Sequence, residues 1–189
     1  MKKILSIIVL GLIITSEGMA YEEANYKVVK KNENYEIRKY SDRLAIETEI
    51  SNQGSSFRKL FNYISDNDEN NEEIKMTTPV IQIEKKGSMT MQFYLPSRFN
   101  KSNTPNPFNS DVKILNIKSD YYAVIIYSGR ASDKNFIKHK DILENELIKN
   151  NISILSTSIK ATYNSPFTLP LLRRNEAMFE VSIETKGEI

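Results

Sequence analysis

Hydrophobic and polar residues alternate over short stretches along most of the chain. Between Leu44 and Ile50, apolar residues or threonine take every second position, and Glu47 and Glu49 stand between them. A period of two residues predicts a β-strand with one buried face. The same reasoning predicts strands at 26–30, 35–40, 44–50, 74–83, 89–95, 112–118, 121–128, 152–163 and 177–184.

The period changes to that of a helix after Gly54. Four apolar residues stand at positions i, i+3, i+4 and i+7 counted from Phe57. This spacing places them on one face and predicts an amphipathic helix of about three turns. Ser55 or Ser56 is expected to cap its first turn.

The second half of the chain repeats this order of elements. A stripe beginning at Phe136 predicts a helix from Ser132 or Asp133 to about Asn150. Each half therefore has the order strand, strand, helix, strand, strand, which suggests an internal duplication. The sequence predicts one α+β domain over residues 21–189, with an antiparallel, barrel-like sheet and both helices packed on it. The two halves are about residues 26–95 and 111–184.

The first twenty residues have the pattern of a secretory leader. Lys2 and Lys3 precede an apolar run at 4–14, and Gly18-Met19-Ala20 has the form of a cleavage site. The run is too short to cross a bilayer, for which roughly 20 residues are needed. We therefore expect cleavage after Ala20, export to the periplasm or the medium, and no stable membrane anchor.

Composition excludes several classes of function. The net charge of +2 over 189 residues gives no reason to expect a nucleic-acid partner. The chain has no cysteine and one histidine, His139, so a thiolate nucleophile and a histidine-rich metal site are excluded. Glycine-rich phosphate loops are also missing from the sequence. We therefore expect a binding protein and not an enzyme.

The segment between the last two predicted strands, 163–176, combines prolines with large apolar residues. The prolines exclude regular structure, and the apolar side chains are costly to leave in water. We expect this late loop either to fold back on the domain or to cover a ligand.

Three segments resemble the SOUL family of haem-binding proteins. They are Tyr35-Glu36-Ile37-Arg38-Lys39-Tyr40, Lys75-Met76-Thr77-Thr78-Pro79-Val80, and Tyr163-Asn164-Ser165-Pro166 followed by Arg173-Arg174-Asn175-Glu176. In this order and spacing the likeness extends from about Tyr26 to Glu184. The resemblance implies a distorted antiparallel β-barrel of two pseudo-symmetric ββαββ halves, flanked by two helices.

The resemblance also implies a function, which is the non-covalent binding of haem or another tetrapyrrole. The implied site is an open hydrophobic groove between the first helix and the late loop. Its apolar residues would contact the macrocycle, and its cations would meet the propionates. The residues implied are Phe57, Arg58, Leu60, Phe61, Met76, Leu169, Leu171 and Arg173.

Axial ligation of the haem iron is not assured in this sequence. Family members that use a histidine ligand carry it where this chain has Lys39, and a protonated lysine is a poor ligand for iron. His139 is the one histidine that could substitute as an axial ligand, but it lies on the flank of the second helical stripe, where a half-buried histidine with a hydrogen-bond partner is the expected reading. Other members bind without a protein ligand, so haem and metal-free porphyrin are both candidate cofactors.

Two functions remain open from the sequence. The first is an exported tetrapyrrole carrier, buffer or scavenger. The alternative is a protein-interaction or general apolar-ligand module that retains the fold without binding haem.

Overall fold

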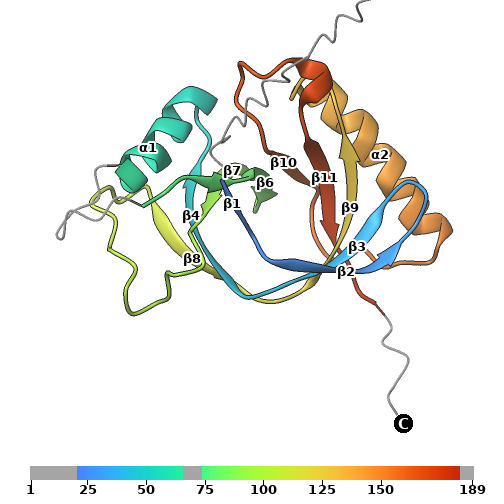
Figure 1. Ribbon diagram of the computed structural model, residues 1–189, viewed down its shortest axis with the longest axis horizontal. Helices are drawn as coiled ribbons and strands as arrows, with labels where there is room; N and C mark the ends of the chain where they lie inside the picture. The colour runs from blue at the N-terminus through green and yellow to red at the C-terminus, as the bar shows by residue number, and fades with distance from the viewer. Residues whose placement is uncertain (1–20, 66–73, 184–189) are drawn as a thin grey trace, which may run out of the picture.

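A nine-stranded antiparallel sheet that curls into a half-barrel forms the body of the protein, as a computed structural model shows (Figure 1). The structure describes residues 21–65 and 74–183, so the leader predicted at 1–20 lies outside the described residues. The first half contains β1 (Glu22–Glu23), β2 (Tyr26–Lys31), β3 (Glu36–Tyr40), β4 (Arg43–Glu49), α1 (Gln53–Ser65), β5 (Thr77–Thr78), β6 (Val80–Lys85) and β7 (Ser88–Tyr94). The second contains β8 (Lys113–Ile117), β9 (Tyr121–Tyr127), α2 (Asp133–Lys149), β10 (Ile159–Thr162), the 3₁₀ helix η1 (Pro170–Leu172) and β11 (Asn175–Glu180).

The sheet joins the two halves by exchanging strands between them. Its order is β2-β3-β9-β11-β10-β6-β7-β4-β8, so β10 and β6 pair at the centre. Strand β3 pairs with β9 of the second half, and β8 pairs with β4 of the first. The predicted fold class is confirmed, with two pseudo-symmetric ββαββ halves in one distorted barrel. Because strands are exchanged, each half needs the other to complete its sheet.

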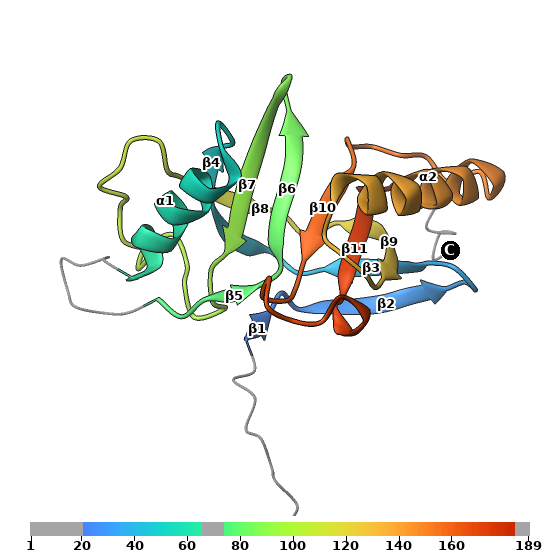
Figure 2. The same cartoon turned by 90° about the horizontal axis from the view of Figure 1, so that it is seen from above.

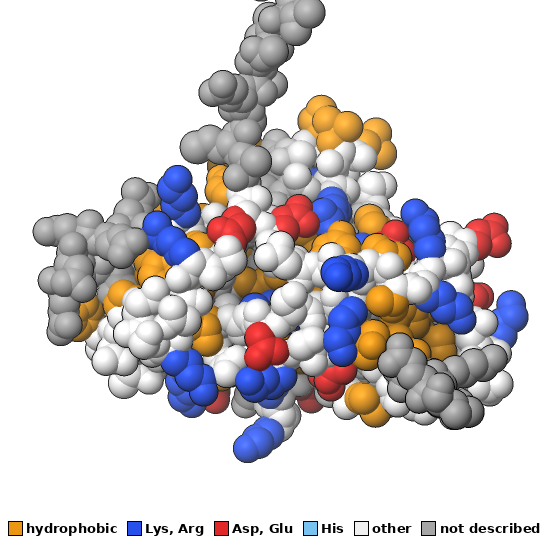
Figure 3. All heavy atoms as spheres, turned by 60° about the horizontal axis from the view of Figure 1, so that its bottom comes forward, with side chains coloured by type: hydrophobic (Ala, Val, Ile, Leu, Met, Phe, Trp, Pro, Cys, Tyr) orange, Lys and Arg blue, Asp and Glu red, His pale blue; other side chains and the backbone are white. Residues whose placement is uncertain are grey.

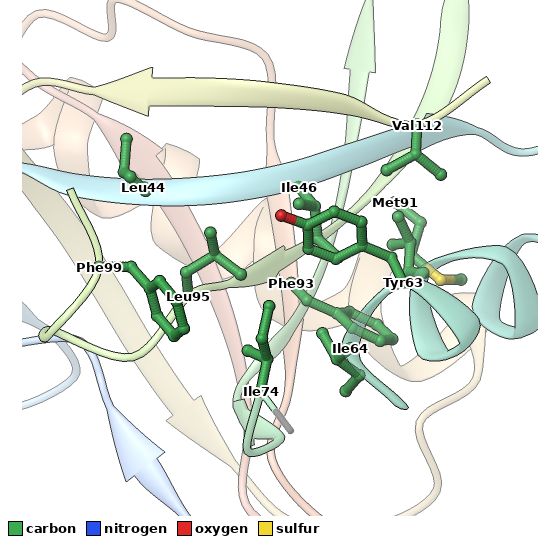
Figure 4. Close-up of a cluster of buried hydrophobic side chains, with 11 residues drawn as sticks. Leu44, Ile46, Tyr63, Ile64, Ile74, Met91, Phe93, Leu95, Phe99 and Val112 are labelled. Atoms are coloured by element: carbon green, nitrogen blue, oxygen red, sulfur yellow. The ribbon is translucent and has the colours of Figure 1, made fainter. Parts of the chain in front are cut away.

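The two helices flank the central strands. Figure 2 shows α1 and α2 at opposite ends of the molecule, with β6, β7 and β10 between them. Each helix covers its own hydrophobic cluster. The cluster under α1 contains Leu60, Ile46 and Phe93, all nearly or fully buried (Figure 4). A second cluster lies under α2, and a third, rich in tyrosine, lies inside the curled sheet.

Both helices form where the sequence predicts them, but the cap of α1 differs. The Asn52 side chain accepts hydrogen bonds from the backbone N–H groups of Gly54 and Ser55, at 2.9 and 3.2 Å. The prediction of Ser55 or Ser56 as the cap is therefore wrong, because asparagine satisfies the free N–H groups as well as serine does and stands one position before the helix. For α2, Ser132 is the cap and accepts from the N–H of Asn135.

Three predicted strands have different bounds in the structure. The stretch 74–83 is divided at the cis peptide Thr78–Pro79 into β5, which pairs with β1, and β6, which enters the main sheet. Only Ile159–Thr162 of the stretch 152–163 is a strand, because the residues before it bond to the ends of β6 and β11 through loop contacts such as Thr157 Oγ1 to Glu84 O. The last strand runs over Asn175–Glu180 instead of 177–184.

The cluster under α1 predicts the effect of truncating Leu60. This side chain is 0 % exposed, so the variant Leu60→Ala should lower the free energy of unfolding by about 2–5 kcal/mol through a cavity. Ile137→Ala, at a position on α2 that is 51 % exposed, is the control and should cost less than about 1 kcal/mol. Urea unfolding measures both, and equal losses would contradict the assignment of Leu60 to the core.

Candidate functional site

An aromatic pair on α1 forms one side of the candidate site. Phe57 and Phe61 stand one turn apart, and their rings stack with centroids 6.1 Å apart. They are 40 % and 44 % exposed, although they belong to the predicted apolar stripe. Phe57 also meets the buried ring of Phe93 edge-on at 5.1 Å. The pair is thus fixed at its base and open to a ligand on its outer side.

The late loop forms the other side. Its four large apolar side chains are 68–94 % exposed, so they are not buried against the domain. Figure 3 shows hydrophobic side chains projecting from the upper edge of the molecule, where Figure 1 places η1. The four residues are Phe167, Leu169, Leu171 and Leu172.

Backbone contacts hold these side chains outward. Arg173 donates from Nε to the carbonyl of Thr168 at 2.7 Å and from Nη2 to that of Pro166 at 2.6 Å. The N–H of Gly129 donates to the carbonyl of Pro170 at 2.8 Å. Gly129 has a φ of +102°, and a Cβ there would lie 2.9 Å from the side-chain nitrogen of Asn135. The loop therefore turns its polar groups inward and presents an apolar surface to water.

A row of paired residues on one face of the sheet connects the two sides. Phe93, under α1, is paired with Val80, and Val80 with Thr162 of β10. Thr162 is in turn paired with Asn175, at the start of the strand that follows the late loop. Paired residues in an antiparallel sheet share a face. Val80 and Thr162 are partly exposed, and the row leads from Phe93, under α1, to Asn175, which directly follows the late loop.

Unpartnered polar atoms lie at the far end of this row. Asn175 Oδ1 and the hydroxyl of Tyr127, its neighbour on β9, are buried and have no hydrogen-bond partner among the described residues. Burial, with the negative charge of Glu176, raises the pKa of Tyr127. The hydroxyl therefore keeps its proton at neutral pH and can act as a donor, while Asn175 Oδ1 can act as an acceptor.

The first and third family-like segments meet in a buried polar cluster behind the site. The guanidinium of Arg38 and the carboxylate of Glu176 are both 0 % exposed and lie 3.1 Å apart. Glu176 also accepts from the hydroxyl of Tyr163 at 2.8 Å and from Arg174 Nη2 at 2.8 Å. Arg38 additionally pairs with Glu36 at 2.9 Å. These residues thus position the strand that follows the late loop.

The second family-like segment reaches the same cluster through β1. Glu23 of β1 accepts two hydrogen bonds from Arg174 Nη1, each of 3.0 Å. Strand β1 also pairs in parallel with β5, where Thr77 is buried and donates to the carbonyl of Tyr94 at 2.6 Å. All three family-like segments are therefore parts of one network. This network joins β5, the strand that follows α1, to the end of the late loop.

The structure places the residues implied by the resemblance in different environments. Phe57, Phe61, Leu169 and Leu171 are exposed, whereas Leu60 is fully buried in the core. Met76 is partly buried against the cluster under α1. Arg58 is exposed and lines a separate cavity beside the loop 107–112. Arg173 holds the late loop together through backbone carbonyls.

Lys39, in β3, and His139, in α2, belong neither to α1 nor to the late loop. The ammonium of Lys39 sits 3.9 Å from the ring centroid of Tyr121, at the start of β9. The ring of His139, on α2, stacks on Tyr127 with centroids 4.1 Å apart. Its Nδ1 lies 2.8 Å from the carbonyl of Asn135, which can only accept, so Nδ1 carries the proton and Nε2 has a free lone pair when the ring is neutral.

The described residues hold no group of three or more histidine, cysteine or acidic side chains that could bind a metal ion. None of the helices in residues 21–65 and 74–183 is long and apolar enough to span a membrane.

Comparison with known proteins gives a family and a fold. A family model described as "SOUL heme-binding protein" matches residues 21–180. The comparison with curated protein sequences found no match.

Several solved structures have a similar fold. The crystal structure of the EcmrR C-terminal domain has a TM-score of 0.57 and 13 % identity, covering 83 % of this chain and 98 % of that one. A structure titled as a hydrolase from Listeria innocua has a TM-score of 0.55 and 7 % identity, covering 82 % and 94 %. A structure titled as an uncharacterized conserved protein from Listeria innocua has a TM-score of 0.57 and 8 % identity, covering 79 % of this chain and 92 % of that one. At these identities the likeness shows the fold alone.

The buried pair predicts a large effect of Glu176→Gln. Without the charge of Glu176, the buried guanidinium of Arg38 is left with only the partly exposed carboxylate of Glu36 as counter-charge among the described residues, so the free energy of unfolding should fall by about 3–5 kcal/mol. Glu144→Gln removes a carboxylate whose side chain is 43 % exposed, and should cost less than about 1 kcal/mol. Urea unfolding compares the two, and similar small losses would contradict the role of the pair.

Glu36 predicts a pH dependence. Burial raises the pKa of its carboxyl group, but the hydrogen bond and charge of Arg38, with those of Lys31, outweigh burial and lower it. Because the folded pKa is below the ordinary value, the ionised group stabilises the fold above about pH 4.5, and this contribution is lost as pH falls through the folded pKa. At pH 7 the free energy of unfolding should therefore be higher for wild type than for Glu36→Gln, and this difference should narrow toward pH 3. A difference that stays constant with pH would refute the prediction.

Proposed function

The chain belongs to the SOUL heme-binding protein family, and we propose that it binds a tetrapyrrole non-covalently between α1 and the late loop, as an exported carrier, buffer or scavenger. The observation that supports the proposal is the presence of two exposed apolar surfaces, Phe57 with Phe61 on α1 and the late loop, which adjoin the two ends of the row from Phe93 to Asn175. The leader-like pattern of residues 1–20 supports export.

A flat macrocycle suits this arrangement. Its faces are apolar and aromatic, as are the α1 pair and the loop. Burying one large apolar side chain is worth about 1.5–3 kcal/mol, so contact with several loop side chains would supply much of the affinity of a micromolar complex.

The proposed complex has no protein ligand to the iron. Lys39 lies beside Tyr121, and His139 is covered on one face by Tyr127, so neither belongs to the α1 and late-loop surfaces. Binding then rests on the macrocycle and its substituents. The porphyrin itself supplies the redox and light-absorbing chemistry when it is bound, and the chain supplies enclosure and orientation.

The late loop gives the most direct test by mutation. Haemin titrated into the protein should shift the Soret band and saturate at micromolar concentration, and Leu171→Asp should weaken binding at least about tenfold by placing a charge against the macrocycle. Leu155→Asp, at a position that is 57 % exposed outside the site, is the matched control. The carrier function is excluded if wild type shows no saturable shift. Saturable binding of apolar dyes alone would then favour the general apolar-ligand module.

A complex without a protein ligand to the iron leads to a second prediction. Metal-free protoporphyrin IX should bind within about threefold of the haemin affinity, because the iron adds no bond to the protein. His139→Ala should leave the Soret maximum of the haemin complex unchanged. A shifted maximum in this variant, or a large preference for haemin, would show that the iron is ligated.

A further inference from the structure

A cavity lies on α1, beside the loop that joins β7 to β8. Its volume is about 430 Å³, within the range of about 300–1,000 Å³ that is usual for small-molecule sites. Figures 1 and 2 both show α1 and this loop side by side at one end of the molecule. The residues that matter here are Arg58, Lys59, Asn62, Tyr63, Phe108 and Val112.

This cavity is separate from the α1 surface used by the proposed function. Consecutive residues of an α-helix are about 100° apart around its axis, so Arg58 and Asn62 stand to one side of the strip formed by Phe57 and Phe61. Neither phenylalanine lines the cavity. None of the cavity residues belongs to the late loop. The inference below therefore does not depend on tetrapyrrole binding.

The loop is fixed to the helix by two contacts at the cavity wall. The hydroxyl of Tyr63 donates to the carbonyl of Pro105 at 2.7 Å, and the ammonium of Lys59 pairs with Asp111 at 2.6 Å. The ring of Tyr63 is buried, as is Val112 beside it, and together they give the cavity an apolar base. The cavity is thus a built feature of the helix–loop contact.

The charges at the wall favour an anion. Lys59 is already compensated by Asp111, whereas Arg58 is exposed and makes no ion pair among the described residues. A guanidinium group can donate two parallel hydrogen bonds to one carboxylate. One uncommitted guanidinium therefore matches a single carboxylate better than a multiply charged phosphate.

The rest of the lining favours a hydrocarbon body. The ring of Phe108 lines the cavity and is 75 % exposed. We propose that this cavity binds a small amphipathic carboxylate, whose carboxylate group pairs with Arg58 and whose hydrocarbon chain lies against Phe108, Tyr63 and Val112.

The experiment uses decanoate as the probe and measures binding by calorimetry with the purified protein. Arg58→Gln should weaken decanoate binding at least about tenfold, the loss expected for a charge-assisted hydrogen-bonded pair. Arg130→Gln removes another exposed arginine outside the cavity and should change the affinity less than about twofold. Phe108→Ala should weaken binding about three- to tenfold. Decanol should bind wild type as weakly as decanoate binds Arg58→Gln.

Any one of three results overturns the proposal. The first is that wild type does not bind decanoate. The second is that Arg58→Gln and Arg130→Gln change the decanoate affinity equally, and the third is that decanol and decanoate bind wild type with equal affinity. Displacement of decanoate by haemin would also overturn it, because the two ligands would then share one site. A protein that binds decanoate but not haemin keeps this inference and rejects the proposed function.

Discussion

The buried contact between Arg38 and Glu176 is the constraint on which the rest of the structure depends. Both side chains are fully excluded from water, and a buried charge is tolerated only when it is paired and hydrogen-bonded. Such a pair adds little net stability compared with apolar packing, but the loss of one partner is severe. Here it joins β3, from the first half of the chain, to β11, from the second. Because strands β3 and β11 both flank β9, the pair helps to fix the register of this part of the sheet.

The same network explains how an exposed apolar loop can be well defined. Arg174 connects Glu176 to Glu23 on β1, and β1 pairs with β5 at the start of the central strand. Arg173, the next residue toward the loop, bonds to the loop's own carbonyls. The polar groups of the loop are therefore satisfied internally, and its leucines and phenylalanine stay in water. Stability lost at an exposed apolar surface is commonly recovered when a ligand covers it.

Much of the fold could be predicted from the sequence, because period-two and period-3.6 patterns report directly on which faces are buried. The pattern could not distinguish a buried stripe residue from an exposed one. Phe57 and Leu60 belong to the same stripe, yet only Leu60 reaches the core, since exposure depends on how the helix is rotated against the sheet. The row formed by Val80, Thr162, Asn175 and Tyr127 could not be predicted from the sequence, because strand pairing between the halves brings these residues together. Arg58 and Arg173 were both expected to meet the propionates of one tetrapyrrole. In the structure, Arg173 bonds to carbonyls of the late loop, and Arg58 lines the cavity beside the loop 107–112.

The central claim is that a tetrapyrrole lies between α1 and the late loop, without a bond from the protein to the iron. Paramagnetic broadening in ¹H–¹⁵N spectra tests it most directly, with haemin compared against its diamagnetic gallium analogue. The account predicts that haemin selectively broadens the amide signals of Phe57, Phe61 and residues 166–172, and leaves those of residues 107–112 unaffected. Broadening centred on His139 or on the loop 107–112, or none at saturating haemin, would contradict it.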